Sequence, residues 1–171
     1  SIERRQTMKA FGAEIILTSQ EGSMELARDT ALGMQKKGMG IVLDQFGNTN
    51  NPKAHYEGTG PEIWRDTNKK VTHFISSMGT TGTIVGTSKF LKEKNKNIKI
   101  IGVQPEEGAQ IPGIRKWPKE YLPSIFSDDN IDEIVNVSQK NAEDTARNLA
   151  KKEGIFSGAS TGGALFVAMQ I

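Results

Sequence analysis

The sequence predicts an α/β fold whose mainly parallel, twisted sheet lies between two layers of helices. Runs of apolar, β-branched residues of strand length alternate along the chain with segments that repeat apolar residues at helical spacing. This alternation is typical of parallel sheets, because a helix that crosses the sheet returns the chain to the same edge. Two glycine-rich turns each follow a predicted strand and precede a predicted helix.

The composition excludes several kinds of site. The 171 residues include 22 basic and 20 acidic side chains, and a net charge of +2 does not by itself indicate a nucleic-acid or membrane partner. The absence of cysteine excludes disulfides, thiolate catalysis and cysteine-based metal sites, and two histidines are too few for a histidine-rich metal site. No apolar run approaches the ~20 residues of a membrane span and no signal-peptide pattern is present, so we expect a cytoplasmic protein.

The first part of the chain reads as helix, strand, helix, strand. Near-helical apolar spacing over 2–11 predicts a helix that ends at a glycine, and the β-branched run 13–18 predicts a short buried strand. A helical apolar stripe follows over 23–38, with Ser23 as a candidate N-cap. Residues 40–46 form the next predicted strand.

The middle of the chain begins with a polar segment, 47–61, which is rich in turn formers and is predicted to be a loop. Residues 61–67 predict a short helix with Pro61 at its first position, where the missing N–H group of proline is tolerated. Residues 71–76 read as a strand and 83–95 as a helix.

The last third repeats the alternation. Residues 98–107 predict a strand, a long loop continues to residue 126, and 131–138 predict a further strand. A helix over 141–154 follows, with Ser138 or Asn141 near its cap. Residues 155–171 predict a short strand, a turn and a helix.

The turn "SSMGTTGT", residues 76–83, has the composition of a phosphate site. Gly79 and Gly82 let backbone N–H groups turn inward, and the dipole of the following helix favours an anion. A phosphate monoester suits such a loop, although an ordinary glycine-rich turn from strand to helix fits equally well, and neither a P-loop nor a G-x-G-x-x-G pattern is present. The loop also supplies three hydroxyl donors, those of Thr80, Thr81 and Thr83.

A second turn, "SGASTGG" at residues 157–163, lies between a short predicted strand and a helix. Ser160 and Thr161 are either N-caps or, for one of them, the source of a neutral hydrogen bond to the ring nitrogen of a bound cofactor.

An ordered set of motifs gives the chain a family resemblance over essentially all 171 residues. The motifs are "ERR..M.AFGAE", "AHYEGTGPEIW", "SSMGTTGT", "QPEEGAQIPGIRKWP" and "GIFSGASTGG". Together they resemble the B-type O-acetylserine sulfhydrylases, or cysteine synthases B. These belong to the fold-type II enzymes that use pyridoxal 5′-phosphate and are similar in fold to the tryptophan synthase β chain.

The resemblance implies a role for each glycine-rich turn. Gly79, Thr80, Thr81, Gly82 and Thr83 would form the cup for the cofactor's phosphate, and the Ser160 hydroxyl would meet the pyridine nitrogen. Residues 1–49 would be part of a smaller domain, and 50–171 part of a larger domain that binds the cofactor. The implied reaction is β-elimination of acetate from O-acetylserine, followed by addition of sulfide or thiosulfate to give cysteine.

Two further segments carry expectations about the substrate. By resemblance Gln45 lies near the substrate carboxylate, although a loop-bracing amide would also suit its place at a strand end. Thr49 stands where the family has the first proline of F-x-N-P-x-N-P. Arg115, Lys116 and Trp117 resemble a mobile loop over the active-site mouth that would bind an anionic sulfur donor; a solvated basic turn with Trp117 as a packed anchor is the alternative.

Some of the family's machinery has no counterpart in these residues. The lysine that forms a Schiff base with the cofactor lies in a motif resembling "GSVKDR", and the asparagine at the cofactor's ring hydroxyl in one resembling "TSGNTG"; neither occurs here. Surface-type patterns surround Lys36, Lys89 and Lys151, so we expect no catalytic residue in the chain, which reads as an internal fragment of a homodimeric enzyme.

Two alternative functions stay open, and both histidines have an ordinary structural interpretation. The chain would otherwise be a non-catalytic fragment that binds a phosphate or a protein partner, or part of a related enzyme such as cystathionine β-synthase. His55 and His73 have no acidic or cysteine partner at a suggestive spacing, and His73 lies in a predicted buried strand, so both are interpreted as structural.

Overall fold

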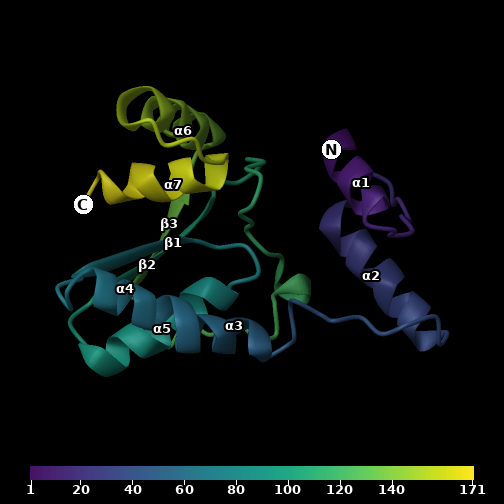
Figure 1. Cartoon of the computed structure of the whole chain (residues 1–171), viewed down its shortest axis with the longest axis horizontal. Helices are drawn as coiled ribbons and strands as arrows, with labels where there is room; N and C mark the ends of the chain where they lie inside the picture. The colour runs from purple at the N-terminus through teal and green to yellow at the C-terminus, as the bar shows by residue number, and fades with distance from the viewer. The chain divides into compact units, whose positions relative to one another are not determined.

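The computed structural model describes residues 1–171 as two compact units, Ser1–Leu43 and Asp44–Ile171 (Figure 1). The first unit contains α1 (Ile2–Ala10) and α2 (Ser23–Lys36). Neither helix has a buried residue. The N-cap of α2 is Gly22, so the prediction of Ser23 at that position is wrong by one residue; with a φ of +48°, Ser23 lacks the extended backbone that a capping side chain needs.

The two strands predicted in this part of the chain, 13–18 and 40–46, do not form. Several of their apolar side chains are exposed, with Ile16 61% exposed and Ile41 88% exposed, although Phe46 at the end of the second segment is buried. A strand is stabilised by the ladder it makes with a neighbour, and no strand of the chain pairs with either segment. The apolar, β-branched pattern was therefore insufficient to predict a strand here.

The second unit is built on a parallel three-stranded sheet in the order β1 (His73–Ser77), β2 (Lys99–Pro105) and β3 (Glu133–Val137). Its register pairs Ile75 with Ile101 and Val103 with Val135. The three strands predicted in this region and their parallel arrangement are thus confirmed.

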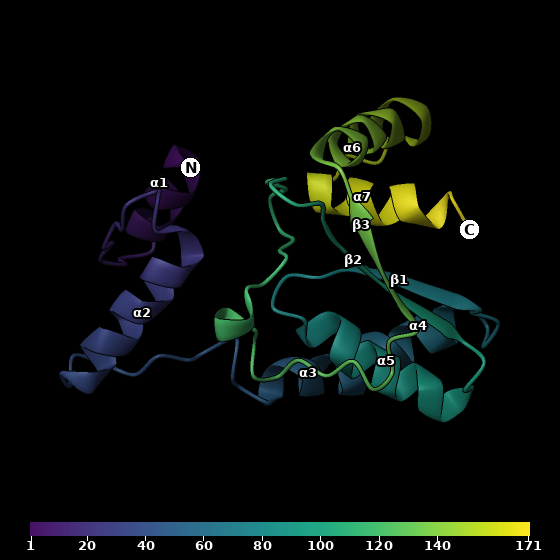
Figure 2. The same ribbon diagram turned by 180° about the vertical axis from the view of Figure 1, so that it is seen from behind.

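The sheet is covered on both faces, which gives the second unit three layers (Figures 1 and 2). Successive strand residues point to opposite faces, so the neighbours Ile100 and Ile101 enter different cores. One core packs against α6 (Gln139–Glu153) and α7 (Ala159–Ala168), and the other against α4 (Gly60–Asp66) and α5 (Gly82–Lys94). The first includes Val103, Ile114, Val137, Ala142 and Val167; the second includes Met78, Ile84, Leu91, Ile98 and Ile100.

Residues 47–61, predicted as a loop, are mostly helical. They hold α3 (Asn50–Ala54), a π-helical turn η1 (His55–Thr59) and the start of α4. The reason lies in tertiary packing, because a Cβ on Gly86 of α5 would overlap the Pro52 carbonyl and come 2.9 Å from the Cβ of His55. This close approach of two helices favours helical backbone in a segment whose local sequence favours turns.

Of the two residues predicted near the cap of α6, Ser138 is the N-cap: its Oγ accepts a hydrogen bond from the Asn141 amide at 3.1 Å. The helix ends at Gly154, whose left-handed φ of +69° suits glycine. The short strand predicted after it is absent, and Phe156 there is 96% exposed. A single 3₁₀ turn, η2 (Lys119–Tyr121), interrupts the long loop between β2 and β3.

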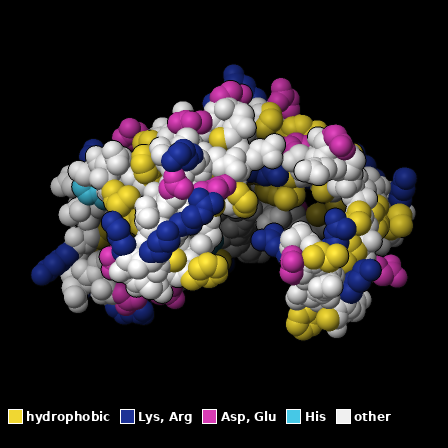
Figure 3. All heavy atoms as spheres, turned by 90° about the horizontal axis from the view of Figure 1, so that it is seen from above, with side chains coloured by type: hydrophobic (Ala, Val, Ile, Leu, Met, Phe, Trp, Pro, Cys, Tyr) yellow, Lys and Arg dark blue, Asp and Glu magenta, His cyan; other side chains and the backbone are white.

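Basic and acidic side chains are mixed over the face seen in Figure 3, in keeping with a net charge of only +2. The structure has no helix with both the length and the apolar character needed to cross a membrane.

Candidate cofactor-phosphate site

The loop Met78–Thr81 joins β1 to α5 at the carboxyl edge of the sheet, where ligands of open parallel sheets bind. Its first residue continues the sheet pattern, since the Met78 amide donates to the Val103 carbonyl at 2.8 Å. The chain then turns sharply, and Thr81 has a φ of +73° immediately before α5 begins at Gly82. The first N–H groups of α5, which have no partner within the helix, therefore open onto this loop.

The Thr81 hydroxyl has no hydrogen-bond partner although it is buried. An unpaired buried hydroxyl is costly, and so is the left-handed backbone of a β-branched residue. Both are explained if an anion binds inside the turn and accepts hydrogen bonds from it. The residues of the loop thus fit a phosphate group, and the phosphate cup of Gly79, Thr80, Thr81, Gly82 and Thr83 stays a prediction.

Both loop glycines lie where a side chain would collide. A Cβ on Gly79 would come 3.0 Å from the Gly113 carbonyl, and a Cβ on Gly82 would overlap the side-chain amide of Asn51. Glycine at these two positions lets the loop sit between a neighbouring loop and α3.

Asn51 connects the loop to the segment that contains Gln45. Its Nδ2 donates to the Thr80 Oγ1 at 3.1 Å and to the Gln45 carbonyl at 2.7 Å. The Asn51 side chain therefore links the backbone of Gln45 to the loop. The side chain of Gln45 itself is exposed.

His55 contacts the other end of the loop. Its Nε2 lies 3.2 Å from the Thr83 Oγ1, and its Nδ1 lies 2.9 Å from the Thr59 Oγ1. Partial burial lowers the pKa of the imidazole below its usual value, which favours the neutral ring. His73, by contrast, is the exposed first residue of β1 and contacts Thr72, so its predicted burial is wrong: the strand end projects into solvent.

Ser160 lies in the first turn of α7, beside the end of β1. Its carbonyl accepts a hydrogen bond from the Ser77 Oγ at 2.6 Å, and its Oγ would lie 3.1 Å from a Cβ on Gly113. The structure therefore brings the two glycine-rich turns together, as the hypothesis of one shared ligand requires. Ser157, which precedes α7, also has a buried hydroxyl without a partner.

The loop that contains Arg115, Lys116 and Trp117 is fastened at several points. The Trp117 Nε1 donates to the Gly79 carbonyl at 2.7 Å, and its ring packs edge-on against Phe46 at 5.3 Å. The Arg115 guanidinium lies 5.4 Å from the centre of the Trp117 ring, and Lys116 pairs with Glu107 at 2.9 Å. Trp117 is thus an anchor that holds the loop directly on Gly79.

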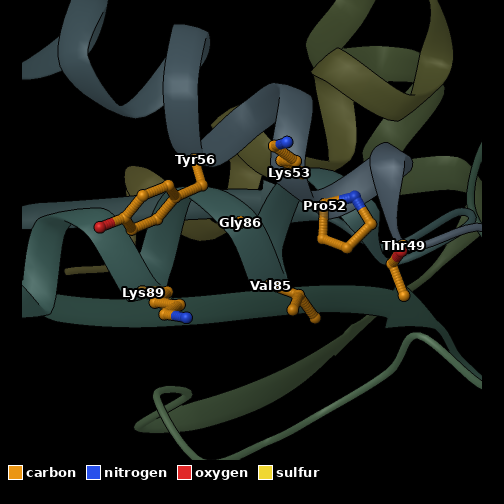
Figure 4. A pocket seen from close by; sticks show the side chains of 7 residues that line it. All are labelled: Thr49, Pro52, Lys53, Tyr56, Val85, Gly86 and Lys89. Atoms are coloured by element: carbon orange, nitrogen blue, oxygen red, sulfur yellow. The ribbon is translucent and has the colours of Figure 1, made fainter.

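A separate hollow of about 260 Å³ lies between α3, η1 and α5 (Figure 4). It is lined by Thr49, Pro52, Lys53, Tyr56, Val85, Gly86 and Lys89. Tyr56 turns its hydroxyl to Glu93 at 2.7 Å, and the Lys89 ammonium lies 5.4 Å from the centre of the Tyr56 ring. None of the predicted phosphate-binding residues lines this hollow.

Comparison with known families gives the class of protein. The chain belongs to the family described as pyridoxal-phosphate dependent enzymes, whose sequence model matches residues 1–171. The cofactor of the family is pyridoxal 5′-phosphate, in agreement with the predicted phosphate loop.

The most specific similarity is to cysteine synthases. The chain is 56% identical over all 171 residues to cysteine synthase B of Salmonella typhimurium, and spans 56% of that protein's length. A crystal structure of cysteine synthase from Entamoeba histolytica matches 96% of the chain with 40% identity and a TM-score of 0.87, and the chain covers 51% of it. A hydrogen sulfide-producing enzyme from Fusobacterium nucleatum matches 99% of the chain with 37% identity and a TM-score of 0.90, with 60% of that protein covered.

These similarities confirm the fold-type II architecture and the resemblance to B-type cysteine synthases that the motifs predicted. The chain spans about half the length of the curated relatives it matches.

Asn51 and His55 were missed as site residues by the sequence analysis. They are four residues apart, a spacing that places two side chains on one face of a helix. Because 47–61 were predicted as a loop, this shared face went unrecognised. The helical signal in that segment was too weak to reveal it, since turn-forming residues dominate.

Proposed function

We propose that this chain forms the cofactor-phosphate site of a cysteine synthase that makes L-cysteine from O-acetyl-L-serine and sulfide or thiosulfate. The observation that carries the proposal is 56% identity to cysteine synthase B over the whole chain, combined with a loop whose buried Thr81 hydroxyl lacks a partner. Such an enzyme is a transferase, and we further propose that it is a cytoplasmic homodimer.

In this proposal the five residues Gly79–Thr83 bind the phosphate through backbone N–H groups and threonine hydroxyls at the start of α5. Bound pyridoxal phosphate supplies an electron sink that favours loss of a leaving group from the substrate's Cβ. The residues of the chain contribute by holding that cofactor at one end and by orienting its ring.

Ser160 is proposed to face the pyridine nitrogen. Its place beside Gly113 and above the end of β1 supports this role, because the phosphate loop begins from the same strand end. A neutral hydroxyl, unlike a carboxylate, does not keep the nitrogen protonated, and a weaker electron sink suits prompt elimination over other reactions of the same substrate.

Gln45 and Arg115 are proposed to contact the substrates. Gln45 would bind the carboxylate of the amino acid, and Arg115 would attract the anionic sulfur donor. The positions of these residues support the proposal: Asn51 ties the Gln45 backbone to Thr80, and Trp117 ties the Arg115 segment to Gly79.

A chimera tests the function. The 171 residues would replace the aligned part of Salmonella cysteine synthase B, whose remaining part contributes the rest of that enzyme. We expect the chimera to bind pyridoxal phosphate and to form cysteine from O-acetylserine and sulfide. The double variant Thr80→Ala, Thr83→Ala should lose cofactor affinity by at least roughly tenfold, since two hydrogen bonds to a charged group are removed.

Two outcomes would contradict parts of the proposal. Unchanged cofactor affinity in the double variant would remove the phosphate assignment. Full cofactor binding without cysteine formation would leave the phosphate site standing and reject the proposed reaction. A matched control, Thr67→Ala on the exposed end of α4, should leave cofactor affinity unchanged.

The alternative is a non-catalytic phosphate-binding chain. It is favoured by the absence, among these residues, of any segment resembling the lysine motif "GSVKDR". We accordingly propose that the chain by itself binds pyridoxal phosphate through the phosphate but forms no cysteine. Cysteine production by the isolated chain in a coupled assay would contradict this.

A further inference from the structure

Asn51 and His55 lie one helical turn apart and each reaches a threonine of the phosphate loop. Asn51 contacts the Thr80 hydroxyl at 3.1 Å, and His55 contacts the Thr83 hydroxyl at 3.2 Å. A threonine hydroxyl carries one hydrogen, so what it offers to a ligand depends on how its other partners use it. The direction of these two hydrogen bonds therefore decides whether the loop can donate to an anion.

The direction is fixed at Thr80. The Gln45 backbone carbonyl can only accept, so the Asn51 atom 2.7 Å from it is the amide nitrogen. The same nitrogen then also donates to the Thr80 Oγ1, which has a further, longer contact with the Gly82 amide at 3.4 Å. Because the Thr80 oxygen accepts from both sides, its own hydrogen remains free for a ligand.

At Thr83 the geometry allows two arrangements. A neutral imidazole has one N–H group, on either Nδ1 or Nε2. If Nδ1 carries the hydrogen, Nε2 accepts from the Thr83 hydroxyl, and that hydroxyl is no longer a donor. If Nε2 carries it, Nε2 donates to Thr83, and Nδ1 accepts from the Thr59 hydroxyl at 2.9 Å.

We propose that His55 holds the Nε2–H tautomer and that Asn51 and His55 together are positioning residues, which make Thr80 and Thr83 obligate donors toward the loop's anion. The inference rests on the proposed function, in which that anion is the cofactor's phosphate. Thr59 completes the chain of hydrogen bonds by donating to Nδ1. The hydrogen bonds then all run in one direction. The Thr59 hydroxyl donates to His55, His55 donates to Thr83, and the Thr83 hydroxyl donates to the anion.

Two features of the backbone bring His55 within reach of Thr83. Gly86 lies one turn after Thr83 on α5, and its missing side chain lets residues 52–55 approach α5 closely enough for His55 to reach Thr83. His55 and Thr59 are the first and last residues of the π-helical turn η1. Such turns are rare and are frequently found at functional sites.

The tautomer can be measured directly in the 171-residue chain. Long-range proton–nitrogen correlation spectra distinguish a protonated from an unprotonated ring nitrogen, and the chain has only two histidines. The variant His73→Gln removes the other signal and lies on an exposed strand end, so it assigns the spectrum. We expect His55 at pH 7 to be protonated on Nε2, with and without inorganic phosphate; a protonated Nδ1 in the phosphate-bound state would overturn the proposal.

Two substitutions test the donor toward Thr83, with inorganic phosphate as the probe. His55→Gln can place an N–H group near the position of Nε2, whereas His55→Asn is too short. We expect His55→Gln to keep phosphate affinity within about twofold and His55→Asn to weaken it roughly 3- to 10-fold, the loss of one hydrogen bond. Thr59→Val should increase the Nδ1–H population and weaken phosphate binding roughly 2- to 3-fold.

The failures are separable. If the wild-type chain binds no phosphate or pyridoxal phosphate, the phosphate site itself is wrong, and the positioning role with it. If phosphate binds but His55→Gln and His55→Asn weaken it equally, or neither changes it, the positioning role is rejected while the phosphate site stands.

Discussion

Two junctions of the same sheet lead from a strand into a helix, and they are built by opposite rules. At the β3–α6 junction, the single residue Ser138 has an extended backbone, with φ −73° and ψ 151°, and caps the helix with its hydroxyl. At the β1–α5 junction, Thr81 has a φ of +73°, makes no side-chain cap, and keeps a buried hydroxyl without a partner.

Under the proposed function, the difference separates a junction that serves stability from one that serves binding. Ser138 follows the local preferences for a helix start, so its hydroxyl is satisfied within the chain. Thr81 violates them, and strained backbone with unsatisfied polar groups persists at sites where a ligand later supplies the missing partner. Substitutions at each junction test this difference.

The largest effect is expected at the first residue of α5. A Cβ in Gly82→Ala would overlap the Asn51 side chain and break its hydrogen bonds to Thr80 and Gln45. We expect the free energy of unfolding to fall by about 1–3 kcal/mol, measured by urea denaturation. The matched change at the first residue of α6, Gln139→Ala, removes only an exposed contact to Glu143 and should cost less than about 0.5 kcal/mol. If Gly82→Ala and Gln139→Ala lowered the free energy of unfolding equally, the two junctions would not differ in the way described.

A second prediction concerns Asp132, at the opposite edge of the same strands. Hydrogen bonds from Lys92 and from the Ile100 amide hold the pKa of its carboxyl below the usual value. The folded state therefore favours the carboxylate, so this contribution is complete above the ordinary pKa of about 3.9 and is lost as the pH falls through the lowered folded-state value.

Asp132→Asn should accordingly lower the free energy of unfolding by roughly 1–2 kcal/mol at pH 7, with a smaller deficit at acidic pH. Denaturation at pH 7 and near pH 3 measures both values. A deficit that grows on acidification would show that the carboxylate is not the stabilising form. The exposed pair of Lys140 and Asp144 is the control, since Asp144→Asn should change the free energy of unfolding far less than Asp132→Asn does.

The third prediction is the loss of the working cap. Ser138→Ala removes the acceptor for the Asn141 amide and should cost about 1 kcal/mol. Ser138→Asp, which keeps an acceptor at the same position, should restore most of the stability. If alanine and aspartate behaved alike, capping would not be what Ser138 contributes.

The same contrast explains which parts of the fold could be predicted. The strand around Val103 and the cap at Ser138 follow from local sequence, because their neighbours in the structure agree with their local preferences. Residues 13–18 have an equally clear strand pattern, yet form none. A strand also needs a partner, and nothing in six residues encodes whether one is present.

The site divides in a similar way. The position of Gly79–Thr83 between a strand and a helix could be predicted, because glycine and threonine there favour a turn before a helix. The contacts of Asn51 and His55 could not, since each joins residues nearly thirty positions apart and depends on how closely α5 packs against α3 and η1. Local sequence determines where the loop lies in the chain, and tertiary packing determines which side chains form hydrogen bonds with it.

The smallest predicted change has the opposite sign to the others. Thr81→Gly relieves the left-handed backbone and removes the buried, unpaired hydroxyl, at the cost of a more flexible unfolded chain. We expect a net gain of about 0.5–1 kcal/mol in the free energy of unfolding without ligand. In parallel, affinity for inorganic phosphate should fall roughly 3- to 10-fold, because one donor is lost.

Thr87 supplies the control for that trade. Its hydroxyl is also buried without a partner, but it lies in the middle of α5. Thr87→Val should therefore raise stability to a similar degree and leave phosphate affinity unchanged. If Thr81→Gly instead lowered stability, the Thr81 hydroxyl would have a partner within the chain, and this junction would differ from that at Ser138 only in geometry. If both substitutions raise stability and only Thr81→Gly weakens phosphate binding, the strained backbone and unpaired hydroxyl of Thr81 contribute to binding the phosphate.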